Sequence, residues 1–310
     1  MIGDKMDLGV IGIGNMGKNH LRVYSELRWV DQLYCFDIDS KKLSALKDKF
    51  EDTVFCDSLD DMLNKIEAAS ICVPTENHLE IIKKCLEKGI SVLVEKPVVS
   101  NSSQGEELLD YVKKNNVIFG VGHIERFNPI VKEISKLVNY PRYIEIKRHN
   151  PSSRRMPLSS VVDDLMIHDI DLVWNIIFKG LKDYSIYSVG DDNFCTVLVS
   201  FGNNIASISA SRFSSRKIRT IYIEDEHVSI EGNFMDQELF VYKRPTKYTA
   251  EDDKYTQENI IEKVLINKVE PLKEELKQFI ESVKSGKPFP VTLEQALLNL
   301  RIVEVIKDKL

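Results

Sequence analysis

A glycine-rich turn near the start of the chain has the residue types and spacing that bind a dinucleotide. The turn is Gly12-Ile13-Gly14-Asn15-Met16-Gly17, with an apolar run at residues 8–11 before it and a helix-compatible stretch after it. The first glycine permits a tight turn, the second lets a pyrophosphate approach the backbone, and the third lets the helix pack close to the strand. We expect free N–H groups at the helix start to bind phosphate. The alternative is a glycine-rich turn in an unrelated α/β fold.

An acidic residue after the next apolar run completes this dinucleotide pattern. Asp37 follows Gly17 by 20 residues and ends the run of residues 33–36. A carboxylate at this position accepts hydrogen bonds from the ribose hydroxyls of NAD and repels the 2′-phosphate of NADP. Lys41 and Lys42 follow shortly afterwards and keep NADP as the less favoured alternative. The sequence therefore predicts NAD as the cofactor.

An aspartate and a histidine in the second half of the chain have the spacing of a helical face. Asp164 and His168 are four residues apart within a predicted helix at 163–178, so both side chains point the same way. One alternative is a helix start stabilised by acids, with His168 in a salt bridge. Another is a metal site completed by His123. Because no further histidine or cysteine cluster supports a metal, we predict none.

A basic stretch lies between these two groups of residues. Residues 126–155 contain eight basic and two acidic side chains, in a chain whose net charge is −6. Arg126 can pair bidentately with a carboxylate or phosphate, and a pyrophosphate would also suit Arg154 and Arg155. The functional interpretation is a rim that attracts an anionic substrate, and the alternative is a solvated face. A second basic strip contains Arg212, Arg216, Lys217 and Arg219.

The first 120 residues alternate between short apolar runs and amphipathic segments. This alternation predicts a doubly wound parallel sheet, because parallel strands need helical crossovers. The predicted strands are residues 8–11, 33–37, 54–56, 69–73, 90–94 and 117–121. The predicted helices are residues 15–27, 40–49, 58–64, 78–88 and 104–115.

The pattern changes after about residue 123. Strand-like runs follow one another closely, which predicts a mostly antiparallel sheet with an open face. These runs are residues 142–148, 184–189, 194–201, 206–212, 218–223, 227–230 and 238–242, and further helices are predicted at 129–138, 271–284 and 293–310. Residues 244–258 are polar and are predicted to form a loose loop. We therefore predict a dinucleotide-binding domain at residues 1–123 and an α+β domain for substrate binding and oligomerisation at 124–310.

Composition limits the class of protein. The chain has 310 residues, of which 43% are hydrophobic, and it contains no run long enough to span a bilayer. Its N-terminus lacks the basic and apolar blocks of a signal peptide, so we expect a cytoplasmic protein. Five cysteines without a CxxC pair indicate core residues in a reducing compartment. The negative net charge argues against general nucleic-acid binding.

Three further motifs, taken with the glycine-rich turn, resemble one family. They are Glu95-Lys96-Pro97, the segment from Gly122 to Pro129 (GHIERFNP) and the segment from Asp164 to Asp171 (DLMIHDID). Together they resemble the glucose–fructose oxidoreductase, inositol dehydrogenase and MocA family (Gfo/Idh/MocA), over nearly the whole chain. The residues of the second and third motifs are most similar to those of the nucleotide-sugar branch, which includes UDP-N-acetylglucosamine 3-dehydrogenases. The family implies a Rossmann domain, an open-faced antiparallel sheet, and hydride transfer between nicotinamide and a secondary hydroxyl.

The resemblance assigns roles to the residues of these motifs. Lys96 takes the position of the catalytic lysine, which removes the hydroxyl proton as hydride leaves the carbon. Glu95 would position Lys96 or contact the nicotinamide ribose, and a cis bond is expected before Pro97. The alternative is a strand that ends in a solvated charge pair.

The resemblance also assigns roles to Asp164 and His168. Asp164 would accept hydrogen bonds from a substrate hydroxyl, and His168 would bind the reacting oxygen and share the proton transfer. Asp171 would orient the imidazole. The family commonly has glycine two residues before this histidine, where this chain has Met166, and a narrower pocket would follow.

Flanking residues complete the predicted site. Pro74, Thr75 and His78 follow the fourth strand and would contact the cofactor, as would the residues of the glycine-rich turn. His123, Arg126 and Asn128 follow the last strand of the first domain and would contact the substrate, together with Arg154 and Arg155. The alternatives for His123 are a cofactor contact and a helix cap.

The sequence thus predicts a dehydrogenase that oxidises a ring hydroxyl with NAD, at C3 of a nucleotide sugar. A free sugar or inositol is the first alternative substrate, and it would not depend on Arg154 or Arg155. An NAD(H)-binding sensor without turnover and an enzyme that reduces a pyrrole or imine are the others. Because an open sheet leaves an apolar face to cover, a homodimer or homotetramer is expected.

Overall fold

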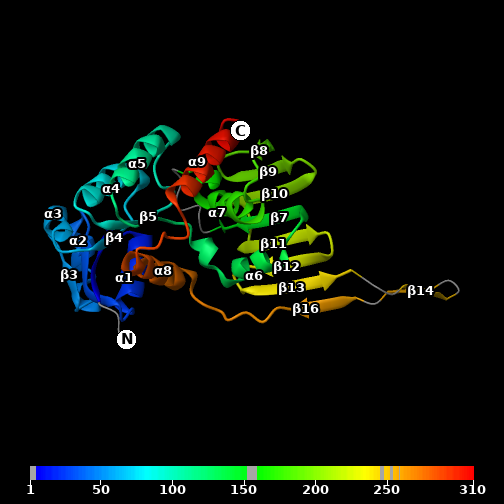
Figure 1. Cartoon of the computed structure of the whole chain (residues 1–310), viewed down its shortest axis with the longest axis horizontal. Helices are drawn as coiled ribbons and strands as arrows, with labels where there is room; N and C mark the ends of the chain where they lie inside the picture. The colour runs from blue at the N-terminus through cyan, green and yellow to red at the C-terminus, as the bar shows by residue number, and fades with distance from the viewer. Residues whose placement is uncertain (1–4, 152–158, 245–247, 252–253, 258) are drawn as a thin grey trace. The chain divides into compact units, whose positions relative to one another are not determined.

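The chain forms two compact units, and each contains its own sheet. The computed structural model describes residues 5–151, 159–244, 248–251, 254–257 and 259–310. The first unit contains residues up to Ile124 together with Glu270–Arg301, and the second contains Glu125–Val269 and Ile302–Leu310. Figure 1 shows the chain, with elements of both units labelled where there is room.

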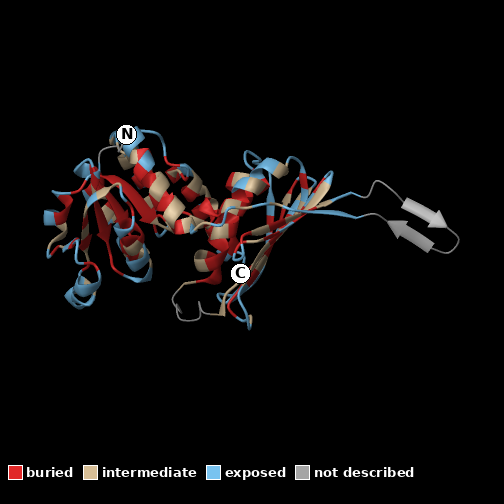
Figure 2. Cartoon of the chain, turned by 90° about the horizontal axis from the view of Figure 1, so that it is seen from below, coloured by how far each residue is buried: buried red, intermediate tan, exposed pale blue. Residues whose placement is uncertain are grey.

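The sheet of the first unit is parallel and has six strands. The strands are β1 (Met6–Ile11), β2 (Val30–Phe36), β3 (Thr53–Phe55), β4 (Ala68–Ile71), β5 (Ser91–Glu95) and β6 (Phe119–Gly122). Their order is β3-β2-β1-β4-β5-β6, so the order reverses between β1 and β4. Buried residues run along most of these strands, as expected for a parallel sheet covered on both faces (Figure 2). The predicted doubly wound sheet is confirmed.

Helices cover this sheet, and those between β1 and β6 also connect its strands. They are α1 (Asn15–Ser25), α2 (Ser40–Ser44), α3 (Leu59–Leu63), α4 (His78–Glu87), α5 (Ser102–Lys114) and α8 (Pro271–Ser285), with short 3-10 turns at Lys47–Lys49, Thr75–Asn77 and Ile124–Phe127. Helices α1 and α8 lie side by side (Figure 1). The predicted helix at 40–49 is divided, because α2 ends at Ser44 and a separate 3-10 turn follows.

The segment 270–301 groups with the first unit, which differs from the predicted domain of residues 124–310. Leu297 of α9 (Leu293–Lys307) packs where Gly105 lacks a side chain, and Phe289 packs in the same way on Gly120. Val121 N also donates to Val291 O. The apolar faces of α8 and of the first part of α9 are therefore part of the Rossmann core.

The second unit is built on an eight-stranded sheet. Its strands are β7 (Pro141–His149), β8 (Ser185–Gly190), β9 (Phe194–Phe201), β10 (Asn204–Ser211), β11 (Ile218–Asp225), β12 (Val228–Asn233), β13 (Glu238–Lys243) and β16 (Ile260–Lys263). Their order is β16-β13-β12-β11-β7-β10-β9-β8, and every pair is antiparallel except β10 with β7. The predicted, mostly antiparallel sheet is confirmed.

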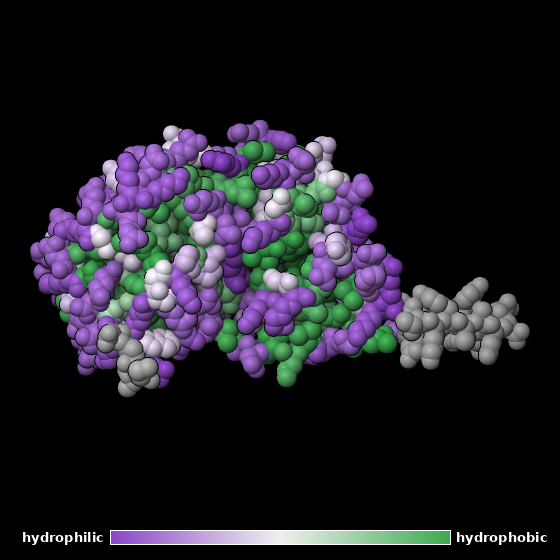
Figure 3. All heavy atoms as spheres, viewed as in Figure 1, coloured by the Kyte–Doolittle hydropathy of each residue, from purple (hydrophilic) through white to green (hydrophobic). Residues whose placement is uncertain are grey.

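One face of this sheet is packed and the other is open. Helix α6 (Pro129–Leu137) places Ile130 close to Gly232 of β12, and the helical segment Val162–Ile177 also covers the packed face. The open face carries a row of register partners, Tyr187, Leu198, Ser207, Glu145, Tyr222, Glu231, Phe240 and Lys263. On the surface in Figure 3, hydrophobic areas of this unit (green) lie between hydrophilic ones (purple).

The prediction of a loose loop at residues 244–258 was wrong where the structure describes it. A small two-stranded sheet pairs β14 (Tyr248–Glu251) with β15 (Lys254–Gln257), and β16 follows. The polar sequence gives no alternating pattern there, so only the pairing of neighbouring strands reveals these elements.

Candidate active site

The glycine-rich turn has the backbone geometry of an anion-binding helix start. Gly12 has a φ of +88°, and a Cβ at Gly17 would lie 1.9 Å from Gly12 O. A Cβ at Gly14 would meet nothing within 4 Å, so the backbone there faces open space. Gly14 caps α1, and no side chain caps the helix. Free N–H donors and an open cradle fit the pyrophosphate of a dinucleotide.

Asp37 at the end of β2 binds this turn directly. Its Oδ2 accepts a hydrogen bond from Ile13 N at 2.6 Å, and its Oδ1 accepts one from Asp39 N at 2.9 Å. The Nζ of Lys42 lies 3.6 Å from Oδ1. The carboxylate is thus fixed beside the turn, where its remaining lone pairs suit ribose hydroxyls.

The other predicted cofactor residues follow strands of the same sheet. Pro74 and Thr75 follow β4, while Glu95 and Lys96 stand where β5 ends. Because all six strands are parallel, their carboxyl ends share the sheet edge that carries the turn. The Lys96–Pro97 bond is cis, as the resemblance implies.

Glu95 is held from two sides. Its Oε1 lies 3.1 Å from His20 Nε2, and its Oε2 accepts from Lys96 N at 3.3 Å. Burial alone would raise the pKa of Glu95, but the hydrogen bond to His20 and the charges of His20 and Lys96 outweigh it, so this pKa is lowered. Glu95 therefore carries a buried negative charge next to Lys96.

His78 binds backbone carbonyl groups on both sides of its ring. Nδ1 lies 3.0 Å from Pro97 O, and Nε2 lies 3.0 Å from Val73 O. Burial lowers the pKa of His78 despite these carbonyls. The imidazole therefore ties the turn after Lys96 to the turn after β4, and its predicted contact with the cofactor stays a prediction.

The helix that carries Asp164 and His168 is not regular. It consists of a π turn (Val162–Met166), α7 (Ile167–Leu172) and a second π turn (Val173–Ile177). Both side chains are partly exposed. π turns occur often at functional sites. Sequence periodicity did not reveal them, since a shift from i−4 to i−5 hydrogen bonds leaves the apolar spacing nearly unchanged.

Arg212 supports Asp164 from the end of β10. Its Nη2 donates to Asp164 Oδ2 at 3.4 Å, and its Nη1 donates to Ser159 O at 2.8 Å and Asp192 O at 3.3 Å. The side chain of Arg212 is only 2% exposed. It thus belongs to the interior, whereas the sequence grouped it with a basic surface strip.

Arg126 and Asn128 are engaged within the second unit. Arg126 binds Asp171 through Nε and Nη2, at 2.5 Å and 2.6 Å. Asn128 caps α6 and donates to Phe234 O at 2.9 Å. Their predicted substrate contacts are untested, and the geometry supports a positioning role for both.

The remaining residues that were predicted to contact the substrate are His123, Arg154 and Arg155. His123 is buried in the first unit, where its Nε2 lies 3.3 Å from Asn299 Nδ2. Arg154 and Arg155 lie outside the described residues. In the part of the chain that the structure describes, no cluster of three or more His, Cys, Asp or Glu side chains is arranged to hold a metal.

Comparisons with known proteins agree with this geometry. Residues 6–123 match the model of the Gfo/Idh/MocA oxidoreductase family, described as having an NAD-binding Rossmann fold. The chain is 26% identical to a UDP-N-acetylglucosamine 3-dehydrogenase of Acidithiobacillus ferrooxidans over 250 residues, 77% of each protein. It is 24% identical to a myo-inositol 2-dehydrogenase of Thermotoga maritima, over 98% of this chain and 96% of that protein.

A solved structure of the Acidithiobacillus dehydrogenase has the same fold. Its TM-score is 0.86 at 21% identity, and the match covers 99% of this chain and 98% of that one. The chain shares this fold, and its residues 6–123 match the Gfo/Idh/MocA family model. It is therefore an oxidoreductase with a dinucleotide-binding Rossmann unit.

The second unit also contains a buried ion network that sequence reasoning missed. Arg148 of β7 donates to Asp169 Oδ1 at 2.7 Å and to Glu125 Oε1 at 2.9 Å, and Arg219 reaches the same Glu125 oxygen at 3.3 Å. Burial would lower the pKa of Arg148, but the two carboxylates raise it. The sequence contained a signal for this network, because Arg148 follows Ile144 and Ile146 on the buried side of β7.

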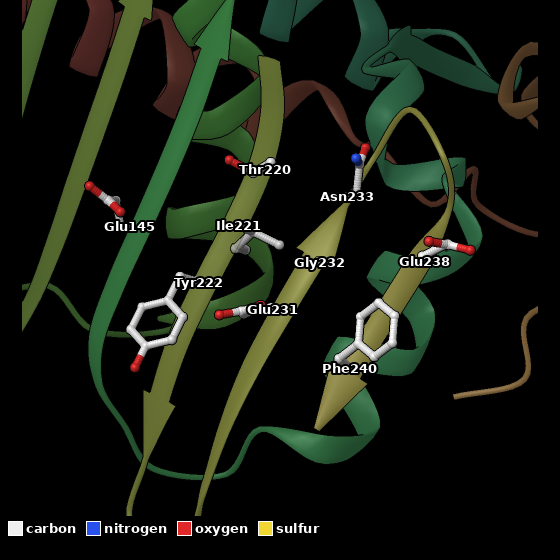
Figure 4. Close-up of a pocket in the computed structure, with 9 residues that line it drawn as sticks. All are labelled: Glu145, Thr220, Ile221, Tyr222, Glu231, Gly232, Asn233, Glu238 and Phe240. Atoms are coloured by element: carbon white, nitrogen blue, oxygen red, sulfur yellow. The ribbon is translucent and has the colours of Figure 1, made fainter. Parts of the chain in front are cut away.

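A hollow of about 400 Å³ lies on the open face of the second sheet. Figure 4 shows Glu145, Tyr222, Glu231 and Phe240 around it, and Glu238 also lines it. Three carboxylates repel a pyrophosphate. We therefore do not assign this hollow to the family's chemistry.

Proposed function

We propose that this chain is an NAD-dependent dehydrogenase that oxidises a ring hydroxyl of a nucleotide sugar, at C3 of a compound such as UDP-N-acetylglucosamine. The observation that carries the chemistry is Lys96 at the carboxyl end of β5, beside a turn that fits a dinucleotide. The observation that carries the substrate is 26% identity over 77% of the chain to a UDP-N-acetylglucosamine 3-dehydrogenase.

NAD is the proposed cofactor because of the charge on Asp37. The carboxylate is 7% exposed and held by two backbone N–H groups, so it cannot easily turn away from a 2′-phosphate. Lys42 near Oδ1 reduces that repulsion only in part. When bound, NAD supplies the acceptor for the hydride.

The residues of the chain supply binding and proton transfer. Lys96 removes the hydroxyl proton, and the negative charge of Glu95 holds the lysine in position. Asp164, supported by Arg212, accepts a hydrogen bond from a substrate hydroxyl. His168 binds the reacting oxygen and assists the proton transfer.

A free sugar or inositol is the second candidate substrate. It is favoured by the 24% identity to a myo-inositol 2-dehydrogenase over nearly the full length of both proteins. The chemistry would be unchanged, and the basic side chains of residues 126–155 would then have no phosphate to bind.

We also propose that the protein is a cytoplasmic homodimer or homotetramer. Five free cysteines suit a reducing compartment. Among the described helices, none has the length and apolar character needed to cross a membrane. The open sheet face exposes Tyr187, Val189 and Leu198, which a second copy would cover. Analytical ultracentrifugation tests this state.

The test is NADH formation on a panel of UDP-sugars, free hexoses and inositols. NAD and NADP are each supplied, and Lys96→Ala is the control variant. Turnover of a UDP-sugar with NAD, lost in Lys96→Ala, supports the proposal. Turnover of neutral sugars alone favours the second candidate. Tight NAD binding without any turnover would favour a non-catalytic sensor instead.

A further inference from the structure

A carboxyl group is buried in the Rossmann unit without a hydrogen-bond partner. Glu275 of α8 is fully buried, and neither of its carboxyl oxygens has a partner. Its neighbours on the same helix face are Leu272, Leu276 and Phe279. Burying a polar group without a partner is destabilising, and such groups are rare in native proteins. The cofactor geometry described above does not account for it.

Titratable groups face Glu275 from the elements packed around it. Glu95 comes from the end of β5, Cys72 from the turn after β4, and Tyr24 from α1. Each of these interacts electrostatically with Glu275. His20 of α1 binds Glu95 through Nε2, and its buried Nδ1 also has no hydrogen-bond partner.

The pKa values of the two carboxyl groups are shifted in opposite directions. Burial and the charge of Glu95 raise the pKa of Glu275 well above its ordinary value. The pKa of Glu95 is instead lowered, because His20 and Lys96 outweigh its burial. Burial keeps Cys72 and Tyr24 neutral by raising the pKa of each. The proton therefore stays on Glu275 and the charge on Glu95.

The positions of Glu95 and Glu275 in the first unit relate these two residues to the nicotinamide half of the cofactor. Asp37 ends β2, on one side of the reversal in strand order, and binds the glycine-rich turn. The adenosine half of a dinucleotide lies on that side, so the nicotinamide half extends toward the ends of β4 and β5. Glu95 stands at the end of β5 and interacts electrostatically with Glu275.

We propose that Glu275 is a positioning residue that holds its proton in the free protein, so that Glu95 carries the single negative charge of this buried site, and that it yields part of this proton when oxidised nicotinamide binds. The inference rests on the proposed function for the role of Lys96 and NAD. Oxidised nicotinamide carries a positive charge and the reduced ring does not. A cation near Glu95 favours ionisation of Glu275, so NAD binding releases a proton to solvent and NADH binding does not.

Two measurements that need no sugar test this proposal. Infrared titration of the protein alone detects the carbonyl stretch of a protonated carboxyl group. We expect this band in the wild type at neutral pH and its loss in Glu275→Gln. Calorimetry in buffers of different ionisation enthalpy then counts protons released by NAD and by NADH at alkaline pH. We expect more release with NAD than with NADH, and no such difference in Glu275→Gln.

Matched variants make the result specific. Glu281→Gln removes an exposed carboxyl from the same helix and is expected to behave as the wild type in both measurements. Glu275→Met fills the buried position with an apolar side chain, and is expected to match Glu275→Gln. The inference would be overturned if the wild type and both Glu275 variants gave identical infrared bands. It would also be overturned if the difference in proton release between NAD and NADH were the same in all three proteins. Inactivity on the sugar panel would overturn the proposed function alone, since neither measurement uses a sugar.

Discussion

Arg212 donates a hydrogen bond from Nη2 to Asp164 Oδ2 over 3.4 Å, from a side chain that is almost completely buried. The same guanidinium binds the carbonyl groups of Ser159 and Asp192. One arginine thus connects the start of the π turn that carries Asp164 to the connection between β8 and β9. The orientation of Asp164 therefore depends on a residue 48 positions away in the chain.

Replacing Arg212 should reduce turnover beyond any loss of stability. Arg212→Lys keeps the charge but loses the planar fork, so we expect kcat to fall by about 10- to 100-fold through misplacement of Asp164. Steady-state NADH formation and thermal unfolding are measured together. Arg216→Met, which changes an exposed residue of the same basic strip, should retain normal kinetics. A lower melting temperature with unchanged kcat in Arg212→Lys would show that Arg212 only stabilises the fold.

Two alanine substitutions in the glycine-rich turn should separate binding from folding. Gly14 has a φ of −75° and open space around its Cβ position, so Gly14→Ala should fold normally and weaken NAD binding by about tenfold or more. In Gly17→Ala the Cβ would clash with Gly12 O, and we expect destabilisation of about 1–3 kcal/mol or more. Denaturant unfolding and NAD titration are measured on both variants. Normal NAD affinity in Gly14→Ala would contradict the assigned phosphate cradle.

Cofactor preference should depend on the charge at Asp37. Asp37→Asn keeps an acceptor beside Ile13 N and removes the charge, so the preference for NAD over NADP should fall by about tenfold or more. The ratio of kcat/KM for the two cofactors measures this effect. Asp39→Asn, which preserves the cap of α2, is the control. An unchanged ratio in Asp37→Asn would mean that Asp37 does not select the cofactor.

The stability of the protein should fall with pH below neutrality because of His78. The pKa of His78 in the folded protein is lower than its ordinary value of 6.5, so its contribution is complete above that pH and is lost as the pH falls through the folded pKa. His78→Gln should flatten this loss between about pH 7.5 and about pH 5. Denaturant midpoints across this range provide the measurement, with the exposed His227→Gln as control. Equal slopes in His78→Gln and the wild type would contradict the assignment.

Much of the fold could be predicted because its signals are local. Apolar runs gave the strands of the first sheet, and Gly202 marks the turn between β9 and β10 with a φ of +61°. The assignment of residues 270–301 to the first unit could not be predicted from local signals. An amphipathic helix does not specify which core it joins, and only the packing of Leu297 on Gly105 reveals it.

The site was predictable as a set of positions but not as a set of contacts. The motifs located Gly12, Asp37 and Lys96 at strand ends, which the parallel sheet brings to one edge. The partner of Arg126 is Asp171, which is 45 residues away, and no spacing rule connects them. Glu275 was detectable in principle, since it occupies an apolar helix face between Leu272 and Phe279.

The central claim is hydride transfer from C3 of a nucleotide sugar to NAD. UDP-N-acetylglucosamine deuterated at C3 is incubated with the protein and NAD, and the reduced cofactor is analysed by mass spectrometry. The account predicts that deuterium appears in the reduced nicotinamide, and that Lys96→Ala slows this transfer by about 100- to 10,000-fold. Unlabelled NADH, with the deuterium retained in the sugar, would contradict oxidation at C3.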